Sequence, residues 1–292
     1  MTPIVLSRWI ARTAIVLSAL LLLNIASAFV YPDVTKLKTS NPRKTAFMEY
    51  RQEEWRKQGK KRKILCHWVS LGRISPYVIK AVIIAEDDKF WTHEGFDFEA
   101  MQKALAKDIQ KKKLKAGGST ISQQLAKNLY LSPSKNPVRK IKEAILTWRI
   151  ERNLTKKRII EIYLNVAEWG EGIFGIEAAA NHYYGKAASL LTAEEAAKLA
   201  CVLPNPRRFA PTGTARYVAS RADFIYQIMV RRGIVIPEYE EVMEVSDEGP
   251  TETAPQTGED QMKKEALPDA PQEEAVSDPF SARKEKSTGK EP

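Results

Sequence analysis

Long apolar runs and helix-period patterns dominate the chain and predict a mostly helical protein. Thr13 to Tyr31 is an uncharged, almost wholly apolar run, just long enough to cross a bilayer. A second apolar run, Val78 to Ala85, follows Ser75-Pro76, a polar cap with proline in the first helical turn. Because isoleucine and valine occupy nearly every side of this run, we predict a helix that is buried all round.

Start and stop signals predict further helices downstream. These helices begin or end at recognisable signals: a polar cap, a capping box, a glycine stop or a proline. The pattern also predicts an extended segment before Ser75. The extended segment covers 64–71, and the helices cover 98–114, 121–129, 137–152, 156–165, the alanine-rich stretch after 172–175, the stretch after Thr192, and 215–232. The 98–114 helix is basic and amphipathic, so it rests either on an anionic membrane or, with a solvated face, over a small core.

Changes in composition divide the chain into four parts. We predict a cytoplasmic tip and transmembrane anchor over 1–32, a stalk over 33–63, one helical domain over 64–240 and a disordered acidic tail over 241–292. Within the stalk, aromatic residues among dense charges are typical of a helix close to the membrane face or of an ordinary solvated helix, and both interpretations stay open.

The N-terminal apolar run has two interpretations. Arg8 and Arg12 precede it, and Trp9 and Tyr31 lie at its edges like interfacial aromatic residues. However, 26–28 (Ala-Ser-Ala) resembles a signal-peptidase site, and the lysines and arginines that follow weaken the positive-inside argument. We favour a retained single anchor with the rest of the chain exported.

Charge indicates a polyanionic partner. The formal net charge is +10, and because the tail from Glu241 onward carries −8, the first 240 residues carry +18. Such a body suits phospholipid headgroups, a phosphorylated substrate or nucleic acid. No recognisable nucleic-acid module or zinc-type cysteine spacing is present, which argues against nucleic acid. Cys66 and Cys201 either pair or remain free thiols, and the sequence leaves both open.

The strongest candidate for chemistry is Glu86, at the end of the buried apolar run. The negative end of the helix dipole and the neighbouring Asp87 and Asp88 both favour a protonatable side chain there. A carboxylate in that state suits general-base catalysis. The alternative is an ordinary acidic helix end that runs into a loop.

Two further segments indicate anion binding. In 117–128, two glycines precede Ser119 and Thr120 and open a helix whose free N–H groups could hold an anion, although the spacing is not that of a Walker loop. Thr120, Gln124 and Lys127 share one polar face of that helix. In the 137–152 helix, Arg139, Lys140 and Glu143 form either a surface ion-pair ladder or a carboxylate beside two cations, suited to a charged substrate or a metal.

Five segments in a fixed order resemble the peptidoglycan glycosyltransferase family. They are EDDKFWTHEGFD (86–97), GGSTISQQLAKN (117–128), RKIKEAILTWRIE (139–151), GIFGIEAAANHYYGK (172–186) and LTAEEAAKLACVLPNPRRFAP (191–211). The run YLNVAEWGEGIFG (163–175) resembles the monofunctional branch. The resemblance implies a lysozyme-like, mostly α domain with a smaller lobe that touches the membrane. Tyr184 is a small departure, since relatives often carry Phe there.

The resemblance also implies roles for individual residues. Glu86 is implied as the general base that takes the proton from the 4-hydroxyl of the acceptor sugar. Glu143 is implied as a second carboxylate that supports the leaving pyrophosphate, as a ligand of Mg²⁺ or Mn²⁺ where an ion takes part. The implied substrate-binding residues are Asp87, Phe90, His93, Gly95, Ser119, Thr120, Gln123, Gln124, Lys127, Asn128, Arg139 and Lys140.

On this resemblance, the substrates are lipid II and the growing glycan chain, with no organic cofactor and no nucleic acid. The expected location is the bacterial inner membrane, as a single-pass protein with its catalytic domain in the periplasm and with cell-division or wall-synthesis proteins as partners. Two other functions are alternatives to this one. A lytic glycosidase would use Glu86 as general acid to cut glycan strands, and a membrane-tethered binding protein would perform no chemistry.

Overall fold

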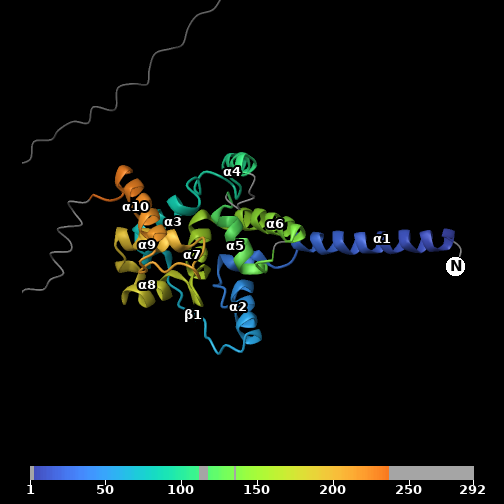
Figure 1. Cartoon of the computed structure of the whole chain (residues 1–292), viewed down its shortest axis with the longest axis horizontal. Helices are drawn as coiled ribbons and strands as arrows, with labels where there is room; N and C mark the ends of the chain where they lie inside the picture. The colour runs from blue at the N-terminus through green and yellow to red at the C-terminus, as the bar shows by residue number, and fades with distance from the viewer. Residues whose placement is uncertain (1–2, 112–117, 135, 237–292) are drawn as a thin grey trace, which may run out of the picture. The chain divides into compact units, whose positions relative to one another are not determined.

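Helices make up nearly all of the regular structure (Figure 1), which confirms the predicted fold class. The computed structural model describes residues 3–111, 118–134 and 136–236. The helices are α1 (Pro3–Ala26), α2 (Ala46–Lys57), α3 (Pro76–Glu86), α4 (Phe98–Lys111), α5 (Ile121–Tyr130), α6 (Pro137–Asn153), α7 (Lys156–Val166), α8 (Ile176–Tyr184), α9 (Ala193–Val202) and α10 (Arg216–Arg231). Short 3-10 turns are η1 (Ser27–Phe29), η2 (Val34–Lys38), η3 (Leu71–Arg73) and η4 (Ala188–Leu190), and the strands are β1 (Leu65–Cys66), β2 (Glu168–Gly170) and β3 (Ile173–Phe174).

Helix α3 lies in the core, where it packs mainly against α9 and also against α10. Val78 and Val82 are fully buried, whereas Lys80 is exposed and Ile79 only partly buried. The prediction of a helix buried all round is therefore wrong on one side, because none of the described residues covers the Lys80 face. The helix starts at Pro76 as predicted, but the Ser75 hydroxyl donates to the Leu191 carbonyl at 2.8 Å instead of capping the helix.

The predicted extended segment contains β1, which belongs to a small sheet of order β1-β3-β2. β1 runs parallel to β3, and β2 runs antiparallel to β3 with a register shift between Glu168 and Gly170. The sequence patterns do not reveal β2 and β3, because two or three residues are too few for an alternating pattern. Gly172 between them has φ +81°, and a Cβ there would lie 2.7 Å from the Trp55 ring, so this turn requires glycine.

The segment predicted as a stalk is instead part of the helical domain. Val34 and Leu37 of η2 join the hydrophobic core, and α2 packs on α5 with Met48 and Trp55 each 2% exposed. Arg158 of α7 donates hydrogen bonds to the carbonyls of Leu37 and Ser40. The boundary predicted at residue 64 is thus too late. The buried positions of α2 recur at helical spacing, but dense charges between them obscure the pattern.

A buried ion pair joins α2 to the sheet across a long sequence separation. The Arg51 guanidinium donates to both oxygens of Glu168, with the Nη2–Oε2 distance at 2.9 Å, and Nη1 donates to Glu54 at 2.9 Å. The side chains of Arg51 and Glu168 are 10% and 3% exposed. A guanidinium that binds a carboxylate through two nitrogens fixes orientation as well as distance, so this pair sets how α2 lies on the domain.

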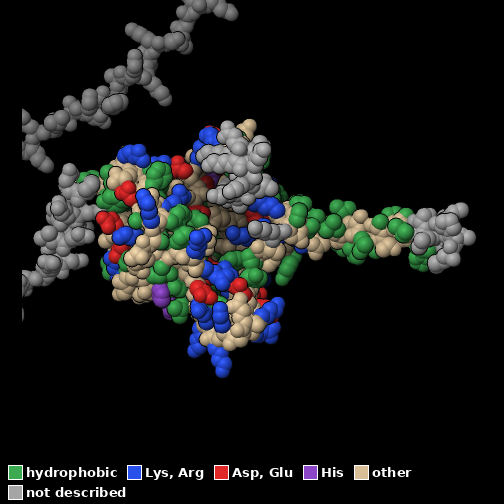
Figure 2. All heavy atoms as spheres, viewed as in Figure 1, with side chains coloured by type: hydrophobic (Ala, Val, Ile, Leu, Met, Phe, Trp, Pro, Cys, Tyr) green, Lys and Arg blue, Asp and Glu red, His purple; other side chains and the backbone are tan. Residues whose placement is uncertain are grey.

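α1 is the one helix in the described part of the chain that is long and apolar enough to cross a membrane. Its apolar side chains are exposed, while Lys and Arg side chains are spread over the domain (Figure 2). At its end, Arg149 of α6 donates to the carbonyls of Ala28 and Val30 at 3.0 and 2.9 Å, and Phe29 meets Trp148 edge to face at 6.4 Å. The apolar helix is therefore bonded to the domain where it ends.

Several predicted helix limits are confirmed. Thr155 caps α7, Thr192 and Glu195 form the capping box of α9, and α10 stops before Gly233. In α4, Phe98 and Leu105 are 74% and 56% exposed, so these two apolar side chains cover no core among the described residues. Ala104 is partly buried, and the side chain of Ile109 lies outside the described residues, so both interpretations of α4 stay predictions. The predicted tail, 241–292, and residues 112–114 of the predicted helix lie outside the described residues.

The docked position of α2 predicts a large effect for one arginine. Arg51→Ala leaves Glu168 buried without its partner, so we expect the free energy of unfolding to fall by about 3–5 kcal/mol. Arg56→Ala on the same helix removes only an exposed pair with Glu53 and should change it by less than about 0.5 kcal/mol. Denaturant unfolding of the detergent-solubilised protein measures both variants. Equal stability of the two variants would contradict this account of α2.

Candidate active site

Glu86 is the last residue of α3, and helix packing holds it at the edge of the core. Its side chain is half-buried, and Oε2 accepts a hydrogen bond from Nε2 of Gln124 on α5 at 2.7 Å. The amide oxygen of Gln124 in turn accepts from the hydroxyl of Tyr163 on α7 at 3.0 Å. Hydrogen bonds thus connect α3, α5 and α7 at this carboxylate, with α7 connected through Gln124.

Burial is the largest influence on Glu86, and it raises the pKa of the carboxyl. The charge of Asp87 adds to the rise, while the hydrogen bond from Gln124 and the positive charges of Arg221 and Lys127 oppose it. The direction agrees with the prediction, but part of the expected cause is wrong. Asp88 is exposed and forms an ion pair with Arg232 at 2.6 Å. The charge of Asp88 is therefore balanced at the surface by Arg232, and Asp88 is not among the groups that raise the pKa of Glu86.

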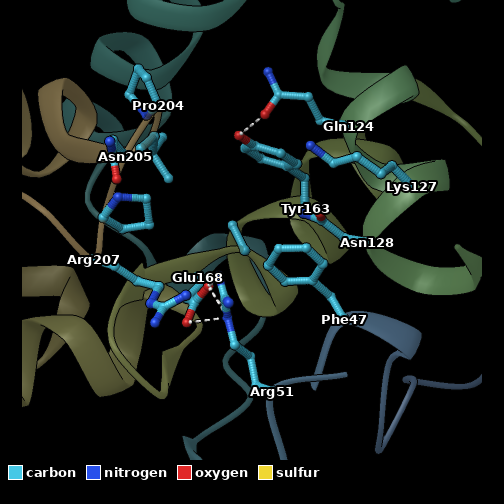
Figure 3. Close-up of a pocket in the computed structure, with 13 residues that line it drawn as sticks. Phe47, Arg51, Gln124, Lys127, Asn128, Tyr163, Glu168, Pro204, Asn205 and Arg207 are labelled. Atoms are coloured by element: carbon cyan, nitrogen blue, oxygen red, sulfur yellow. Dashed lines mark hydrogen bonds and ion pairs between the residues drawn. The ribbon is translucent and has the colours of Figure 1, made fainter. Parts of the chain in front are cut away.

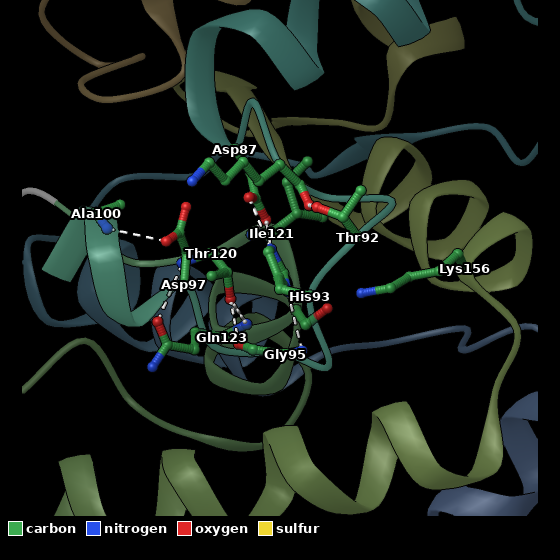
Figure 4. A network of polar contacts seen from close by, with 12 residues as sticks. Asp87, Thr92, His93, Gly95, Asp97, Ala100, Thr120, Ile121, Gln123 and Lys156 are labelled. Atoms are coloured by element: carbon green, nitrogen blue, oxygen red, sulfur yellow. Dashed lines mark hydrogen bonds and ion pairs between the residues drawn. The ribbon is translucent and has the colours of Figure 1, made fainter. Parts of the chain in front are cut away.

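The segment after Glu86 is held in place by a polar network (Figure 4). Nε2 of His93 lies 2.8 Å from Oδ1 of Asp87, and Nδ1 accepts the Gly95 N–H at 3.0 Å. Because Nδ1 is an acceptor, the proton of the neutral ring is on Nε2, where it donates to Asp87. Asp87 and His93, predicted to bind substrate, are thus engaged in shaping this loop.

The N-terminus of α5 is closed to an anion at three of its N–H groups. Thr120 N donates to Oε1 of Gln123 at 3.0 Å, Gln123 N donates to Oγ1 of Thr120 at 3.2 Å, and Ile121 N donates to Oδ2 of Asp87 at 2.9 Å. The prediction that free N–H groups of this helix hold an anion is therefore wrong for these groups, because a capping box and a carboxylate satisfy them. Ser119 is exposed beside them, and Gly117 lies outside the described residues.

Two other predicted site residues support the loop from inside. Phe90 is fully buried, with the Lys156 ammonium 4.7 Å from its ring centre, so its side chain offers no exposed surface to a ligand. Gly95 has φ +91°, and a Cβ there would lie 2.9 Å from Cγ of Glu151. Its carbonyl accepts from the Thr120 hydroxyl at 2.7 Å. Both residues fix the path of the chain between Glu86 and α5.

Cations gather at the other end of α5. Glu143 of α6 is 2% exposed, and its two oxygens accept separately from Arg139 and Lys140. Lys127 is half-buried beside them; burial lowers the pKa of its ammonium, and Glu143 and Glu86 both counter that fall. In the part of the chain that the structure describes, no carboxylate forms an ion pair with Lys127. The predicted cluster is therefore real, with Lys127 under the influence of both carboxylates.

A pocket of about 200 Å³ opens beside these groups (Figure 3). Gln124, Lys127 and Asn128 of α5 face it from one side, and Asn205 and Arg207 face it from the other. Polar nitrogen-bearing side chains therefore line opposite walls. The pocket can take a polar, anionic group within reach of the amide that holds Glu86.

The residues do not fit a metal centre built by the protein. Both oxygens of Glu143 already accept from cations, and no group of three or more His, Cys, Asp or Glu side chains within the described ranges could hold an ion. Mg²⁺ prefers oxygen ligands in octahedral arrangement. The expectation of Mg²⁺ or Mn²⁺ at Glu143 stays a prediction.

Sequence reasoning missed several residues of this site. Arg221 of α10 lies close enough to Glu86 to lower its pKa, and its Nε is buried without a hydrogen-bond partner among the described residues. Nothing in the pattern of α10 distinguishes this arginine from its basic neighbours. Tyr163 did carry a signal, since it places a polar tip within an otherwise apolar helical stripe.

A half-buried carboxylate close to a polar pocket, lined by a lysine that is unpaired in the described part of the chain, is the arrangement expected of an enzyme that transfers a group from a phosphate-bearing donor. A family model described as Transglycosylase matches residues 53–230. The biosynthetic peptidoglycan transglycosylase of Laribacter hongkongensis is 48% identical over 69% of this chain and 88% of its own length. Proteins of that name from Nitrosospira multiformis (42% identical; 78% and 98% covered) and Aromatoleum aromaticum (50%; 69% and 87%) are also similar. The chain belongs to the transglycosylase family, which confirms the resemblance seen in the sequence.

The cation cluster predicts a pH effect. In Glu143→Gln, Lys127 loses the anion that partly offsets its burial, so the pKa of its ammonium falls further. Because an ammonium attracts an anion only while it is protonated, a role for Lys127 in anion binding predicts that the alkaline limb of the activity–pH profile moves to lower pH. Glu194→Gln, which removes an exposed carboxylate on α9, is the control and should leave the limb in place. An alkaline limb that does not move in Glu143→Gln would contradict a role for Lys127 in binding an anion.

Proposed function

We propose that the protein polymerises lipid II into glycan strands of peptidoglycan, by inverting glycosyl transfer with release of undecaprenyl pyrophosphate. One observation carries the proposal. Gln124 holds the half-buried Glu86 and lines the same pocket as Lys127, a lysine without an ion-pair partner among the described residues. The amide that holds the proposed base on α3 and the proposed anion-binding cation therefore lie one helical turn apart on α5.

Glu86 is the proposed general base. It takes the proton from the 4-hydroxyl of the acceptor sugar while that oxygen attacks the anomeric carbon of the donor. The bond from this carbon to the pyrophosphate oxygen breaks, and the electron pair leaves with the pyrophosphate. Support comes from burial, which raises the pKa of Glu86 and makes the carboxylate more basic.

Lys127, Arg139 and Lys140 are proposed to bind the departing pyrophosphate, with Glu143 holding the last two together. Fixed cations stabilise the negative charge that grows on a leaving group without having to reorient during the reaction. The ion pairs of Glu143 keep Arg139 and Lys140 grouped before substrate binds. Arg139 suits this role because a guanidinium can bind two phosphate oxygens at once.

We further propose that α1 is a retained inner-membrane anchor that leaves the domain in the periplasm. Ala28, the last residue of the signal-peptidase-like sequence, is 3% exposed, and its carbonyl accepts from Arg149. This burial and bonding argue against cleavage after Ala28. The exposed Phe98 and Leu105 of α4 support a smaller lobe that rests on the membrane.

Replacement of the proposed base tests the reaction. Glu86→Gln keeps the size of the side chain but cannot take up the proton, so we expect polymerisation of lipid II to fall by at least about 10²–10⁴-fold. Glu94→Gln changes an exposed carboxylate on the same loop and should retain wild-type turnover. Wild-type turnover in Glu86→Gln would refute the mechanism. Digestion of finished sacculi by the wild-type protein would favour a lytic glycosidase instead.

The anchor has a separate test. Because the junction after α1 is buried and bonded, we expect membrane-extracted protein to keep its N-terminal segment. Intact-mass spectrometry measures this directly. A mature chain that begins at Phe29 would identify the apolar run as a cleaved export signal.

A further inference from the structure

Tyr163 is a buried residue whose hydroxyl reaches the proposed active site. It belongs to α7, is 1% exposed, and packs its ring within the hydrophobic core. The hydroxyl donates to the Gln124 amide oxygen at 3.0 Å, and the nitrogen of the same amide donates to Glu86 at 2.7 Å (Figure 3 draws the first of these bonds). A continuous chain of hydrogen bonds therefore runs from α7 through α5 to α3.

We propose that Tyr163 is a positioning residue for glycosyl transfer: its hydroxyl holds the Gln124 amide, and that amide holds the carboxylate of Glu86. The inference rests on the proposed function, because it takes Glu86 as the base. An ionised carboxylate only accepts hydrogen bonds, so the amide must turn its NH₂ group toward Glu86. With a donor at the amide oxygen, both ends of Gln124 are satisfied in that orientation.

The surroundings of Tyr163 keep its hydroxyl a donor. Burial, the largest cause, raises the pKa of Tyr163 well above its ordinary value, and Glu86 and Asp87 raise it further. The Tyr163 phenol therefore stays protonated over the pH range in which the enzyme works. The charged groups that act on Glu86 itself are Arg221 from α10, Lys127 from α5 and Asp87 from the following loop. Tyr163 adds a neutral, directional contact from α7.

The hydrogen bond from Gln124 favours the ionised form of Glu86 and so lowers its pKa. Without the Tyr163 hydroxyl, the amide can turn away, and the pKa of Glu86 rises. Because the base works only when ionised, activity is then lost at a higher pH on the acid side. A residue that merely filled the core would change stability but leave this limb in place.

Tyr163→Phe keeps the ring and removes the hydroxyl. We expect kcat for lipid II polymerisation to fall about tenfold, as for loss of one buried hydrogen bond, with KM within about twofold. The acid limb of the pH profile should move to higher pH. The matched control is Tyr184→Phe, which removes a buried hydroxyl without a hydrogen-bond partner in the described residues and should change neither kcat nor the limb. An unchanged kcat and limb in Tyr163→Phe would overturn the proposal.

A double-mutant cycle tests whether Tyr163 acts through Gln124. Gln124→Met should move the acid limb in the same direction, and Tyr163→Phe should cause little further loss in that background. Additive losses would overturn the proposal. If Tyr163→Phe fails to fold, Gln124→Met is the test by itself. A wild-type kcat and an unmoved acid limb in Gln124→Met would then overturn the proposal. An active Glu86→Gln enzyme would refute the base and the inference together, whereas an inactive one beside a normal Tyr163→Phe would refute the inference alone.

Discussion

A carboxylate at the end of an apolar helix is partly removed from water, and the site depends on how the surrounding helices offset that burial. Left alone, a buried carboxyl keeps its proton and cannot serve as a base. Gln124 supplies a hydrogen bond to Glu86, and Arg221 and Lys127 supply positive charge. These groups come from α5 and α10, so the ionisation of one side chain depends on the packing of the whole helical domain.

Helix α5 has separate tasks at its two ends. Its N-terminus is structural: the capping box of Thr120 and Gln123 and the carboxylate of Asp87 occupy N–H groups that an anion would need. The polar face further along carries Gln124 and Lys127, which face the pocket. An anion in this pocket would therefore be held by side-chain charges rather than by the helix terminus, and its binding would weaken as salt screens those charges.

Helix α6 links the site to the apolar helix α1. Arg149 donates hydrogen bonds to the backbone that follows α1, and Glu143, which binds Arg139 and Lys140, lies six residues (about 1.7 turns) earlier. Six residues of helix rise about 9 Å, so the two features are close and rigidly related. Since η2 and α2 are also docked on the domain, the chain between α1 and the core is not a loose tether. Helix α6 therefore holds the cation cluster at a fixed distance from the backbone that follows α1.

The sequence by itself determined the elements whose causes are local. Capping residues and glycine stops predicted α7, α9 and α10 closely, the apolar run predicted α1, and five ordered motifs identified the family. Local patterns also brought Glu86, Gln124, Lys127 and Glu143 forward as candidates. These features need only neighbours within a turn or two along the chain, and such neighbours are visible in the sequence.

Only the tertiary structure decided what depends on distant partners. Charges along α2 concealed that Arg51 has its partner 117 residues away in Glu168, so a docked helix resembled a stalk. The N–H groups of α5 looked available until Asp87 and Thr120 were found to use them. Arg221 had no local signal at all, because its effect on Glu86 arises from α10 packing against α3. Burial and charge depend on which residues lie close together in space, and the spacing of residues along the chain does not reveal those neighbours.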